Sequence, residues 1–553
     1  MKRFLWLGFV LFIYVICSGC GDTFRPIIIP NPPIFPSPKA AHSVVAINDN
    51  GSAAPGSAMV VDVSGDTDVS VHDVGYAPVH AVQQTASQVL VVNHSASNGQ
   101  ADSITKLSFS GTTINGSTTI SLPANSAPNF VAVAPTDTTA YVTLPDYVPD
   151  PSNFPNDDAV GVVSTQSNNV LATIMVGNNP VALAVTPDKS KLYVANQGDG
   201  TISAFNTVDR SARTITGSLT YPPIWLVART DSQRVYVLEQ TTIHGLGGTL
   251  AWIDTTSTAG PDVLTETAIS VPGATTMTYD PNLNRLYIPG GPQVAIVDVS
   301  QSLPQLLGGG PLTISPVLSS SRASGDVCST FSPGPGAFTV AAVAALPDGS
   351  RAYVGSNARF EVDVTISNAS LNSDNVHTTY TYSLSSSTPD LLSGMVITIS
   401  NVYSTGFDKN KIPPSDFDGT FTILSVGGGT FEVANAPTDT YIRGGAGVAP
   451  NICPQVTVIN ATSNTIKTPQ ITIPGVPGYE PFCSNTRFRL MMAAAGDSSR
   501  TYLSSCDGGN VSLIDTSNDT YIENLPAPVS NSRPIPPNPL NPPQNPVFLF
   551  AGP

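Results

Sequence analysis

Apolar and polar residues alternate along most of this chain, in short runs that turn residues separate. One stretch shows the pattern best. An apolar run from Asn179 to Pro187 is followed by a turn, by Lys191-Leu-Tyr-Val-Ala-Asn196, and by a second turn, Gly-Asp-Gly-Thr. A further run begins at Ile202. Alternation with period two is typical of half-buried β-strands. The stretch therefore predicts consecutive strands joined by tight turns.

The phrase around Tyr193 recurs along the chain, each time in a second strand after a turn. The other copies are Val44-Val-Ala-Ile-Asn48, Leu90-Val-Val-Asn93, Ala140-Tyr-Val-Thr143, Val235-Tyr-Val237, Leu286-Tyr-Ile288, Ala352-Tyr-Val354 and Thr501-Tyr-Leu503. Four strands repeated every roughly 40–50 residues indicate propeller blades. The sequence predicts an all-β protein with a seven- or eight-bladed β-propeller. The copies count to eight, and seven is the commoner number.

The two ends of the repeat complete each other. The segment from Asn545 to Pro553 matches the first strand of a unit, whereas the first unit, from His42, lacks that strand. We expect the C-terminal strand to close the N-terminal blade, because closure removes an open sheet edge. The proline-rich stretch from Leu525 to Pro546 is the predicted connector.

These phrases resemble the YVTN family of β-propellers, named for the second-strand motif and seen in prokaryotic envelope and surface-layer proteins. The resemblance covers residues 42–553 apart from one insert. It implies the fold, a packing role for Tyr193 and its equivalents, and a turn role for Asn196 and its equivalents. It implies almost nothing about a ligand or an activity.

One insert interrupts the repeat between the strands of Tyr353 and Val456. Residues 358–451 carry strand signals of their own, beginning with Phe360-Glu-Val-Asp-Val-Thr-Ile366. A segment of about 90 residues can bury a small core, so we predict an inserted β-barrel or sandwich domain. The propeller then comprises residues 42–357 and 452–553. Two roles of the insert stay open, an elaboration of the packing and a binding module.

The N-terminus predicts export. Lys2 and Arg3 precede an apolar run, and Cys17-Ser-Gly-Cys20 follows. Residues 1–20 resemble a bacterial lipoprotein signal peptide with Cys20 as the lipidated residue, although Cys17 stands where leucine is usual. The alternative is an ordinary secretory signal. Residues 21–41 predict a proline-rich spacer. We expect a membrane-anchored lipoprotein at the periplasmic face or the cell surface, with the outer membrane favoured.

Charge narrows the set of partners. Only 11% of residues are charged and the formal net charge is −16. This composition argues against nucleic acid as a partner. The long predicted loops lie between second and third strands, on the face that also carries the connectors between blades. We expect recognition on this decorated face.

Four cysteines follow Cys20, and an even number in an exported protein favours disulfides. Cys328 and Cys483 lie in connectors before a first strand, whereas Cys453 and Cys506 lie in the second-to-third loop of the blade that follows. Three pairings are possible. Equivalent positions in consecutive blades favour Cys328–Cys453 and Cys483–Cys506.

Two sets of charged residues are candidates for ligand binding. The four carboxylates of one loop offer oxygen ligands suited to Ca²⁺, without EF-hand spacing; a solvated acidic loop is the ordinary alternative. These residues are Asp146, Asp150, Asp157 and Asp158. Arg487 and Arg489 lead into a first strand and could bind an anion or carboxylate; the alternative is an exposed position at the start of that strand. The six histidines are scattered and predict no metal or catalytic centre.

The sequence thus favours a non-enzymatic, lipid-anchored scaffold without a cofactor. Its decorated face and insert would bind an envelope protein or polysaccharide. The alternative is a propeller enzyme, similar to lactonases or quinoprotein dehydrogenases, with His, Arg and acidic side chains converging at the central channel. A third interpretation is a surface coat that self-assembles. The fold does not decide between them.

Overall fold

The computed structural model describes residues 43–51, 54–94, 100–242, 245–317, 321–330, 338–385, 390–404, 416–438, 441–478, 483, 487–529 and 543–552. The predicted signal peptide, Cys20 and the spacer lie outside these residues, as does part of the proline-rich connector. Among the residues described, no helix has the length and apolar character that a membrane crossing requires.

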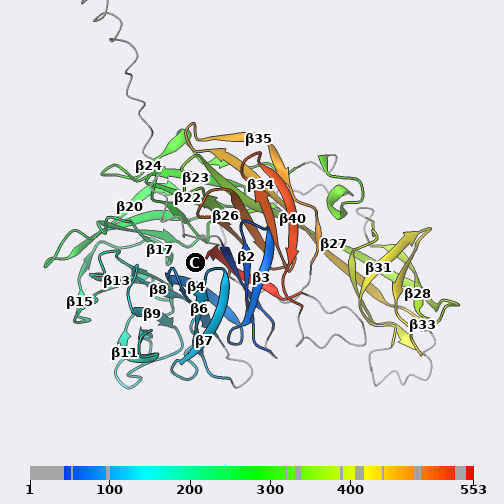
Figure 1. The fold of residues 1–553 in the computed structure, drawn as a ribbon, viewed down its shortest axis with the longest axis horizontal. Coiled ribbons are helices and arrows are strands. Elements are labelled where there is room, and N and C mark those ends of the chain that lie inside the picture. The colour runs from blue at the N-terminus through cyan, green and yellow to red at the C-terminus, as the bar shows by residue number, and fades with distance from the viewer. Residues whose placement is uncertain are drawn as a thin grey trace, which may run out of the picture. The chain divides into compact units, whose positions relative to one another are not determined.

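Seven sheets of four or five strands form propeller blades, and Figure 1 shows them side by side around a common centre. The strands of the first four blades are β41 (Asn545–Ala551), β1 (Ser43–Asp49), β2 (Ser57–Asp62) and β3 (Thr67–Asp73); β4 (Pro78–Thr85), β5 (Gln88–Asn93), β6 (Ser103–Ser110) and β7 (Thr113–Ser121); β8 (Val131–Val133), β9 (Thr139–Leu144), β10 (Ala159–Ser164) and β11 (Asn169–Met175); and β12 (Pro180–Val185), β13 (Lys191–Asn196), β14 (Thr201–Asn206) and β15 (Ala212–Arg213).

The other three blades follow the same order, with short additional strands. Their strands are β17 (Pro223–Ala228), β18 (Arg234–Glu239), β19 (Thr249–Asp254) and β20 (Asp262–Ser270), with β16 (Ile215–Thr216) beside β20; β21 (Thr278–Asp280), β22 (Arg285–Gly290), β23 (Gln293–Asp298), β24 (Gln305–Leu306) and β25 (Leu312–Thr313); and β37 (Leu490–Ala494), β38 (Arg500–Ser505), β39 (Asn510–Asp515) and β40 (Thr520–Pro526). The 3₁₀ turns η1 (Leu307–Gly309) and η3 (Val327–Thr330) lie in the connector that follows β24.

An eighth, nine-stranded sheet completes the ring. Its strands β26 (Phe338–Ala345), β27 (Arg351–Leu371), β34 (Ala446–Asn460) and β35 (Thr465–Thr472) repeat the order of a blade. The sheet contacts β22 on one side and β37 on the other. The prediction of seven or eight blades is therefore confirmed: seven ordinary blades are present, and the larger sheet takes the remaining position.

The ring closes as predicted. β1 pairs antiparallel with β41, from Val44 opposite Ala551 to Asp49 opposite Asn545. First strands meet around the centre, where β12 contacts both β8 and β17. Hydrophobic clusters join neighbouring sheets; in one of them, Val44 and Met59 pack with Tyr502 and Leu549. Burial of the apolar face of each blade against the next is what stabilises such a repeat.

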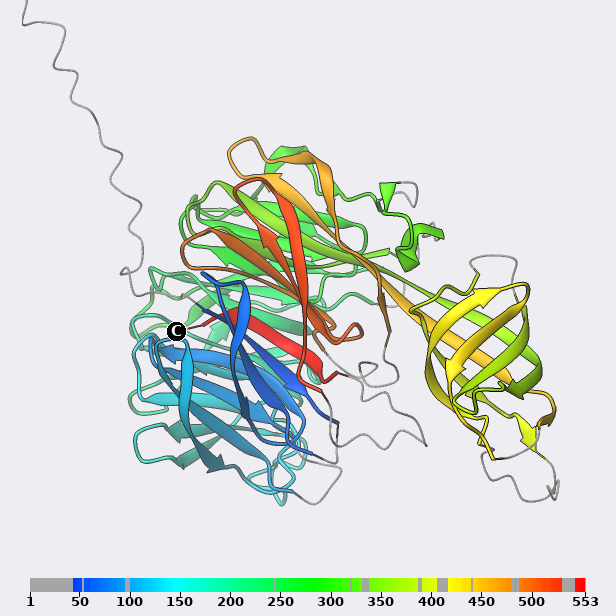
Figure 2. The same cartoon turned by 45° about the vertical axis from the view of Figure 1, so that its right-hand side comes forward.

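The insert grows directly out of the larger sheet. β27 and β34 pair without interruption from Arg351 opposite Asn460 to Thr365 opposite Ala446, and Figure 2 shows both strands running on into the insert. The sequence predicted a separate strand beginning at Phe360, and this prediction is wrong. The segment is instead the outer half of the long strand β27. The remaining strands are β28 (His377–Leu384), β29 (Val396–Ser400), β31 (Gly419–Gly427), β32 (Thr430–Ala434) and β36 (Val476–Pro477) in the same sheet, and the pair β30 (Tyr403–Ser404) and β33 (Tyr441–Arg443).

The insert has an apolar core of its own aromatic residues. Tyr380 stacks on Phe431 with ring centroids 5.1 Å apart. Phe417 and Phe421 are also buried there, and the Tyr380 hydroxyl donates a hydrogen bond to the carbonyl of Phe417. Aromatic pairs of this kind contribute beyond the area they bury.

The repeated tyrosine is a core residue, and a basic residue two positions before it joins the blade to its neighbour. The tyrosines Tyr193, Tyr236, Tyr287, Tyr353 and Tyr502 are fully buried. The basic residues are Lys191, Arg234, Arg285, Arg351 and Arg500. Each reaches the turn or strand that follows the third strand of the next blade. The sequence contains this Lys/Arg-x-Tyr pattern, and its role emerges only from the structure.

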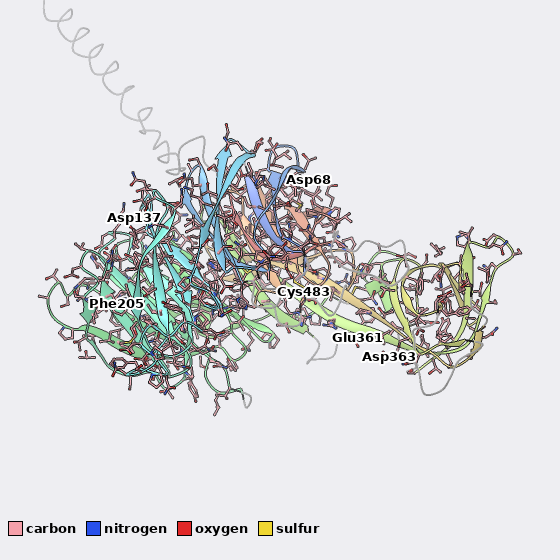
Figure 3. All side chains as sticks on the ribbon, turned by 90° about the horizontal axis from the view of Figure 1, so that it is seen from below. Asp68, Asp137, Phe205, Glu361, Asp363 and Cys483 are labelled. Carbon is pink, nitrogen blue, oxygen red and sulfur yellow. A yellow bond between two sulfur atoms is a disulfide. The ribbon has the colours of Figure 1, made fainter. Side chains whose placement is uncertain are left out.

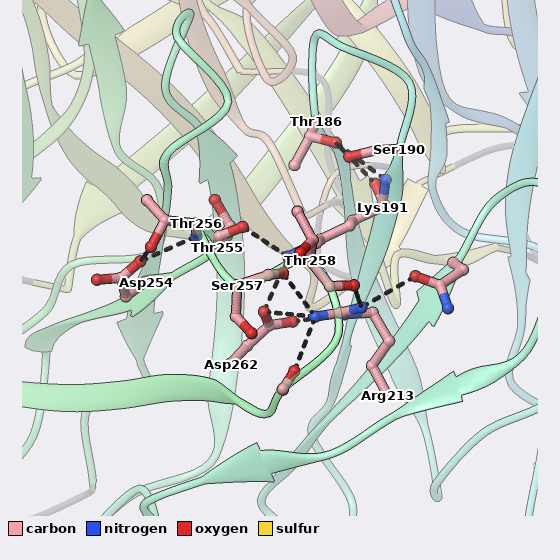
Figure 4. A network of polar contacts seen from close by, with 12 residues as sticks. Thr186, Ser190, Lys191, Arg213, Asp254, Thr255, Thr256, Ser257, Thr258 and Asp262 are labelled. Atoms are coloured by element: carbon pink, nitrogen blue, oxygen red, sulfur yellow. Dashed lines mark hydrogen bonds and ion pairs between the residues drawn. The ribbon is translucent and has the colours of Figure 1, made fainter.

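Asp262 forms the most buried of these contacts (Figure 4). Its carboxylate accepts hydrogen bonds from the Lys191 ammonium at 2.9 Å, the Arg213 Nε at 2.9 Å and the Tyr193 hydroxyl at 2.8 Å. Burial alone would raise the pKa of Asp262, but these donors hold the pKa below its ordinary value. Lys191, Tyr193 and Arg213 come from one blade and Asp262 from the next, so the network joins the two sheets.

Candidate functional site

A cavity of about 810 Å³ opens at the centre of the ring, on the decorated face. Its lining comes from the ends of second strands and the starts of first strands, as the topology requires for this face. The polar lining residues are Asp49, Asn129, Gln197, Gln240, Thr241, Thr275 and Arg487. Its volume falls within the range of about 300–1,000 Å³ that is usual for small-molecule sites.

Five aromatic side chains from five blades, in first strands or just before them, lie beside this cavity in a closed cycle. Successive ring centroids lie 3.9 Å apart for His80 and Phe130, 5.4 Å for Phe130 and Trp225, and 5.6 Å for Trp225 and Phe488. They lie 5.4 Å apart for Phe488 and Phe548, and 4.5 Å for Phe548 and His80. Edge-to-face and stacked contacts of this kind make a well-packed apolar layer.

His80 is an uncharged member of this layer. Burial, and then the neighbouring Arg487 cation, hold its pKa well below the ordinary value. Its Nδ1 accepts a hydrogen bond from the backbone N–H of Val131 at 3.4 Å. His80 therefore acts as a neutral packing residue at physiological pH.

Arg487 extends across the aromatic layer to the opposite side of the ring. Its guanidinium donates to the carbonyl of Val181 at 2.6 Å and to the carbonyl of Ile224. It also lies 5.1 Å from the Trp225 ring and 5.2 Å from the Phe488 ring, so the aromatic faces stabilise the cation. Arg487 is exposed and precedes β37, as the alternative predicted, and its guanidinium reaches the centre of the ring.

The charge of Arg487 has no carboxylate partner among the described residues. Protein surrounds the residue, and this burial lowers its pKa to about 10, so the guanidinium stays protonated at neutral pH. The side chain is nonetheless exposed to solvent within the cavity. A ligand in the cavity can therefore reach the remaining N–H groups of the guanidinium.

A second cavity of about 560 Å³ adjoins the first, and both are lined by Thr275 and Arg487. It lies against the part of β27 that leads into the insert, where Figure 3 labels Glu361. Arg489 also lines it. The structure pairs Arg489 with the buried Asp507 through two hydrogen bonds, Nε–Oδ2 at 3.0 Å and Nη2–Oδ1 at 2.5 Å. The two arginines predicted to bind an anion thus differ, because Arg489 has a carboxylate partner.

A pair of glutamates lies behind the wall of the first cavity. Glu239 precedes the lining residue Gln240 and is fully buried. Burial, together with the neighbouring Glu266, raises the pKa of Glu239 to about 8. Its carboxyl group accepts a hydrogen bond from the backbone N–H of Tyr221 at 3.1 Å. At neutral pH the two glutamates therefore hold one proton, on Glu239. No pattern in the sequence predicts this pair.

Both disulfides are present in the predicted pairing. Cys328–Cys453 joins the connector turn η3 to β34 at the base of the insert, and Cys483–Cys506 joins a connector to the end of β38. Cys453 lies within a strand rather than in the predicted loop, because β34 continues through that position. Both bonds lie on the decorated face, next to the strands that line the cavities.

The carboxylates proposed for Ca²⁺ do not form a compact set of ligands. Asp150 accepts a hydrogen bond from the Asn153 side chain at 2.8 Å, and buried Asp158 accepts one from the Asn179 N–H at 2.7 Å. Three or more potential metal-ligand groups within 4.8 Å of one another occur once in the described residues, and the four aspartates are not among them. A calcium site there stays a prediction.

The compact set consists of Asp374, His377 and Glu432, in the insert. The sequence predicted no such centre from the histidines, and its only signal is the Asp-x-x-His spacing. His377 Nδ1 lies 2.6 Å from Asp374 Oδ2, and this pairing raises the pKa of His377 and lowers that of Asp374 to about 2. Glu432 accepts a hydrogen bond from Asn372 at 2.7 Å. The contacts describe a turn held by its own side chains.

Neither cavity includes a histidine among its described lining residues. Charged side chains do converge at the second cavity, where they form the pairs Arg359–Glu361 and Arg489–Asp507. The enzyme alternative requires His, Arg and acidic side chains to converge at the central channel. Only arginines and acids converge here, and they neutralise each other in ion pairs. The first cavity differs, because Arg487 has no carboxylate partner among the described residues there, and Asp49 lines the same cavity.

No family model matches this chain, and no curated protein matches it. Similar solved structures include apo AztD from Citrobacter koseri, with 9% sequence identity, 92% of this chain and 98% of that chain covered, and a TM-score of 0.47. Hydrazine synthase from Kuenenia stuttgartiensis has 12% identity over 72% of this chain and 85% of that chain, with a TM-score of 0.36. Likenesses this distant concern the fold, so function must be argued from the cavities.

Proposed function

We propose that this protein is a binding propeller whose site is the central cavity of the decorated face, where Arg487 pairs with a carboxylate of the ligand. The observation that carries the proposal is a guanidinium that lines the cavity and has no carboxylate partner among the described residues. In a chain of net charge −16, such an uncompensated cation favours one anionic group at that place.

The surroundings of Arg487 favour a carboxylate over a phosphate. Two of its five N–H groups already donate to the carbonyls of Val181 and Ile224, and those carbonyl dipoles place partial negative charge beside the cation. A singly charged carboxylate balances the remaining charge, whereas a doubly charged phosphate would exceed it. Carboxamides at Asn129, Gln197 and Gln240 can both donate to and accept from neutral parts of the ligand.

The setting that we propose is the cell envelope. The predicted signal peptide and the predicted lipidation of Cys20 support a membrane-anchored, exported protein. The two disulfides support an oxidising compartment. The decorated face and the insert then serve as the binding side of a scaffold, with an envelope polysaccharide or protein as the partner.

Fluorescence of Trp225 tests the site directly, because this indole lies 5.1 Å from the Arg487 guanidinium. We expect glucuronate to change the emission in a saturable way, and glucose and inorganic phosphate to change it much less. In Arg487→Gln the affinity for glucuronate should fall by roughly ten- to hundredfold, since a hydrogen bond to a charged group is lost.

Arg234→Gln is the matched control. Arg234 also donates to two backbone carbonyls and lies 4.4 Å over a tryptophan, Trp252, but it does not line the cavity. This variant should bind glucuronate as the unaltered protein does. The proposal fails if Arg487→Gln, shown to be folded by its circular dichroism spectrum, keeps the full response to glucuronate, or if phosphate binds better than glucuronate.

A further inference from the structure

The two cavities adjoin and share two lining residues, Thr275 and Arg487. The pair of cavities is referred to as the cleft. The first cavity lies at the centre of the ring, and the second extends from there to Asn357 and Phe360 on β27. With volumes of about 810 Å³ and 560 Å³, the two together exceed the size usual for one small molecule. A cleft of this form suits a chain of several units.

The lining of the cleft suits hydroxyl groups. In addition to the three carboxamides of the first cavity, the second presents Thr276, Thr339 and Asn357. Hydroxyl and carboxamide groups are each both donors and acceptors, as are the hydroxyls of a sugar. Val181 and Ile224 also line the first cavity, and their aliphatic side chains can contact the apolar faces of sugar rings.

The same geometry disfavours a peptide that would bind by adding a strand. β12 and β17 are the first strands of their sheets, and each pairs with one strand in its own sheet. Their free edges could receive an extended peptide. Arg487, however, already occupies the carbonyls of Val181 and Ile224 on these two edges. A peptide would have to displace the Arg487 guanidinium from these carbonyls, whereas a carboxylated sugar would pair with the guanidinium where it lies.

We propose that the ligand is an acidic oligosaccharide, a chain of uronic acid units. One carboxylate pairs with Arg487 at the junction, and neighbouring units occupy the cavities on either side. This inference rests on the proposed function and adds the class of ligand and the extent of the site. It assigns to the insert a direct role, because the root of its strand β27 forms one wall of the cleft.

The test compares galacturonate with tetragalacturonate by isothermal titration calorimetry on the full protein. The tetramer should bind at least about tenfold more tightly than the monomer, since more units contact the cleft. Thr339→Phe fills the second cavity from an exposed position of β26. It should lower the affinity for the tetramer to that for the monomer. Thr118→Phe, at an exposed position of the outer strand β7, is the matched control and should change neither.

The outcomes separate the two proposals. If monomer and tetramer bind equally and both depend on Arg487, the binding of one chain across both cavities is refuted while the carboxylate site stands. If an acidic peptide of equal charge binds more tightly than the tetramer, the saccharide class is refuted. If galacturonate, the tetramer and glucuronate all fail to bind in an Arg487-dependent way, the proposed function fails together with this inference.

Discussion

Replacing Asp262 by asparagine tests how strongly the contacts between blades stabilise the ring. The substitution keeps the size of the side chain and removes its charge. It leaves Lys191 and Arg213 buried, with side-chain exposures of 7% and 5%, beside a neutral group. Removing one partner of a buried ion pair costs about 3–5 kcal/mol.

The lower end of that range applies here, because both cations keep other acceptors. Lys191 still donates to the carbonyls of Thr255 and Ser257, and Arg213 to that of Ser257. We expect Asp262→Asn to lower the free energy of unfolding by about 3 kcal/mol. Asp519→Asn is the matched comparison, because the same repeat position joins two other blades there. Its partners Arg351 and Lys467 are 23% and 53% exposed, and pairs so exposed contribute about 1 kcal/mol.

The measurement is urea unfolding at pH 7, followed by far-ultraviolet circular dichroism and evaluated at the transition midpoint. At this pH the low pKa of Asp262 keeps the carboxylate ionised. Because the pKa of Asp262 is lower in the folded state than its ordinary value of 3.8, the ionised carboxylate stabilises the fold at pH values above 3.8. This stabilisation is lost as the pH falls through the pKa of the folded state. Equal losses for Asp262→Asn and Asp519→Asn would refute the reasoning, because burial would then not decide the cost.

Three further predictions follow from the structure and the sequence. Glu239→Gln should flatten the pH dependence of stability. With a pKa raised from 4.5 to about 8, the native protein loses stability as the pH rises through that window, and the lowered pKa of Glu266 offsets part of this loss; an unchanged pH profile of urea midpoints in the variant would contradict this. Replacing Cys328 and Cys453 by serine should lower the free energy of unfolding by about 2–5 kcal/mol. By calorimetry, the affinity for glucuronate should change less than the affinity for tetragalacturonate. Unchanged stability would argue against a disulfide between these two residues. Cys20→Ser should release the protein from membranes in a fractionation experiment, and retention in the membrane fraction would contradict lipid anchoring.

The repeat in the sequence predicts most of the fold. A phrase such as Lys191 to Asn196, copied at regular intervals, fixes the order of strands in each blade, and the matching ends predict the pairing of β1 with β41. The disulfide pairing followed from the same map, because equivalent positions in consecutive blades lie on one face. These features are local patterns or consequences of a repeat.

The site needed contacts across the ring, which no local pattern encodes. Arg487 meets Val181 and Ile224 only because the blade of β37 lies opposite those of β12 and β17, and the aromatic cycle takes one member from each of five blades. The full length of β27 could not be predicted from the sequence for another reason. One long strand and two separate strands produce the same alternation of apolar residues, here Phe360, Val362, Val364 and Ile366.

The pairing of β1 with β41 also sets an order of events during biogenesis. A chain synthesised from its N-terminus completes β1 first and its partner β41 after all the other strands described. Until β41 arrives, the edge of β1 remains an unpaired template for other strands. The period in which the newly made protein is prone to aggregate is therefore set by the time its C-terminal end takes to reach the first blade, and not by the stability of the finished ring.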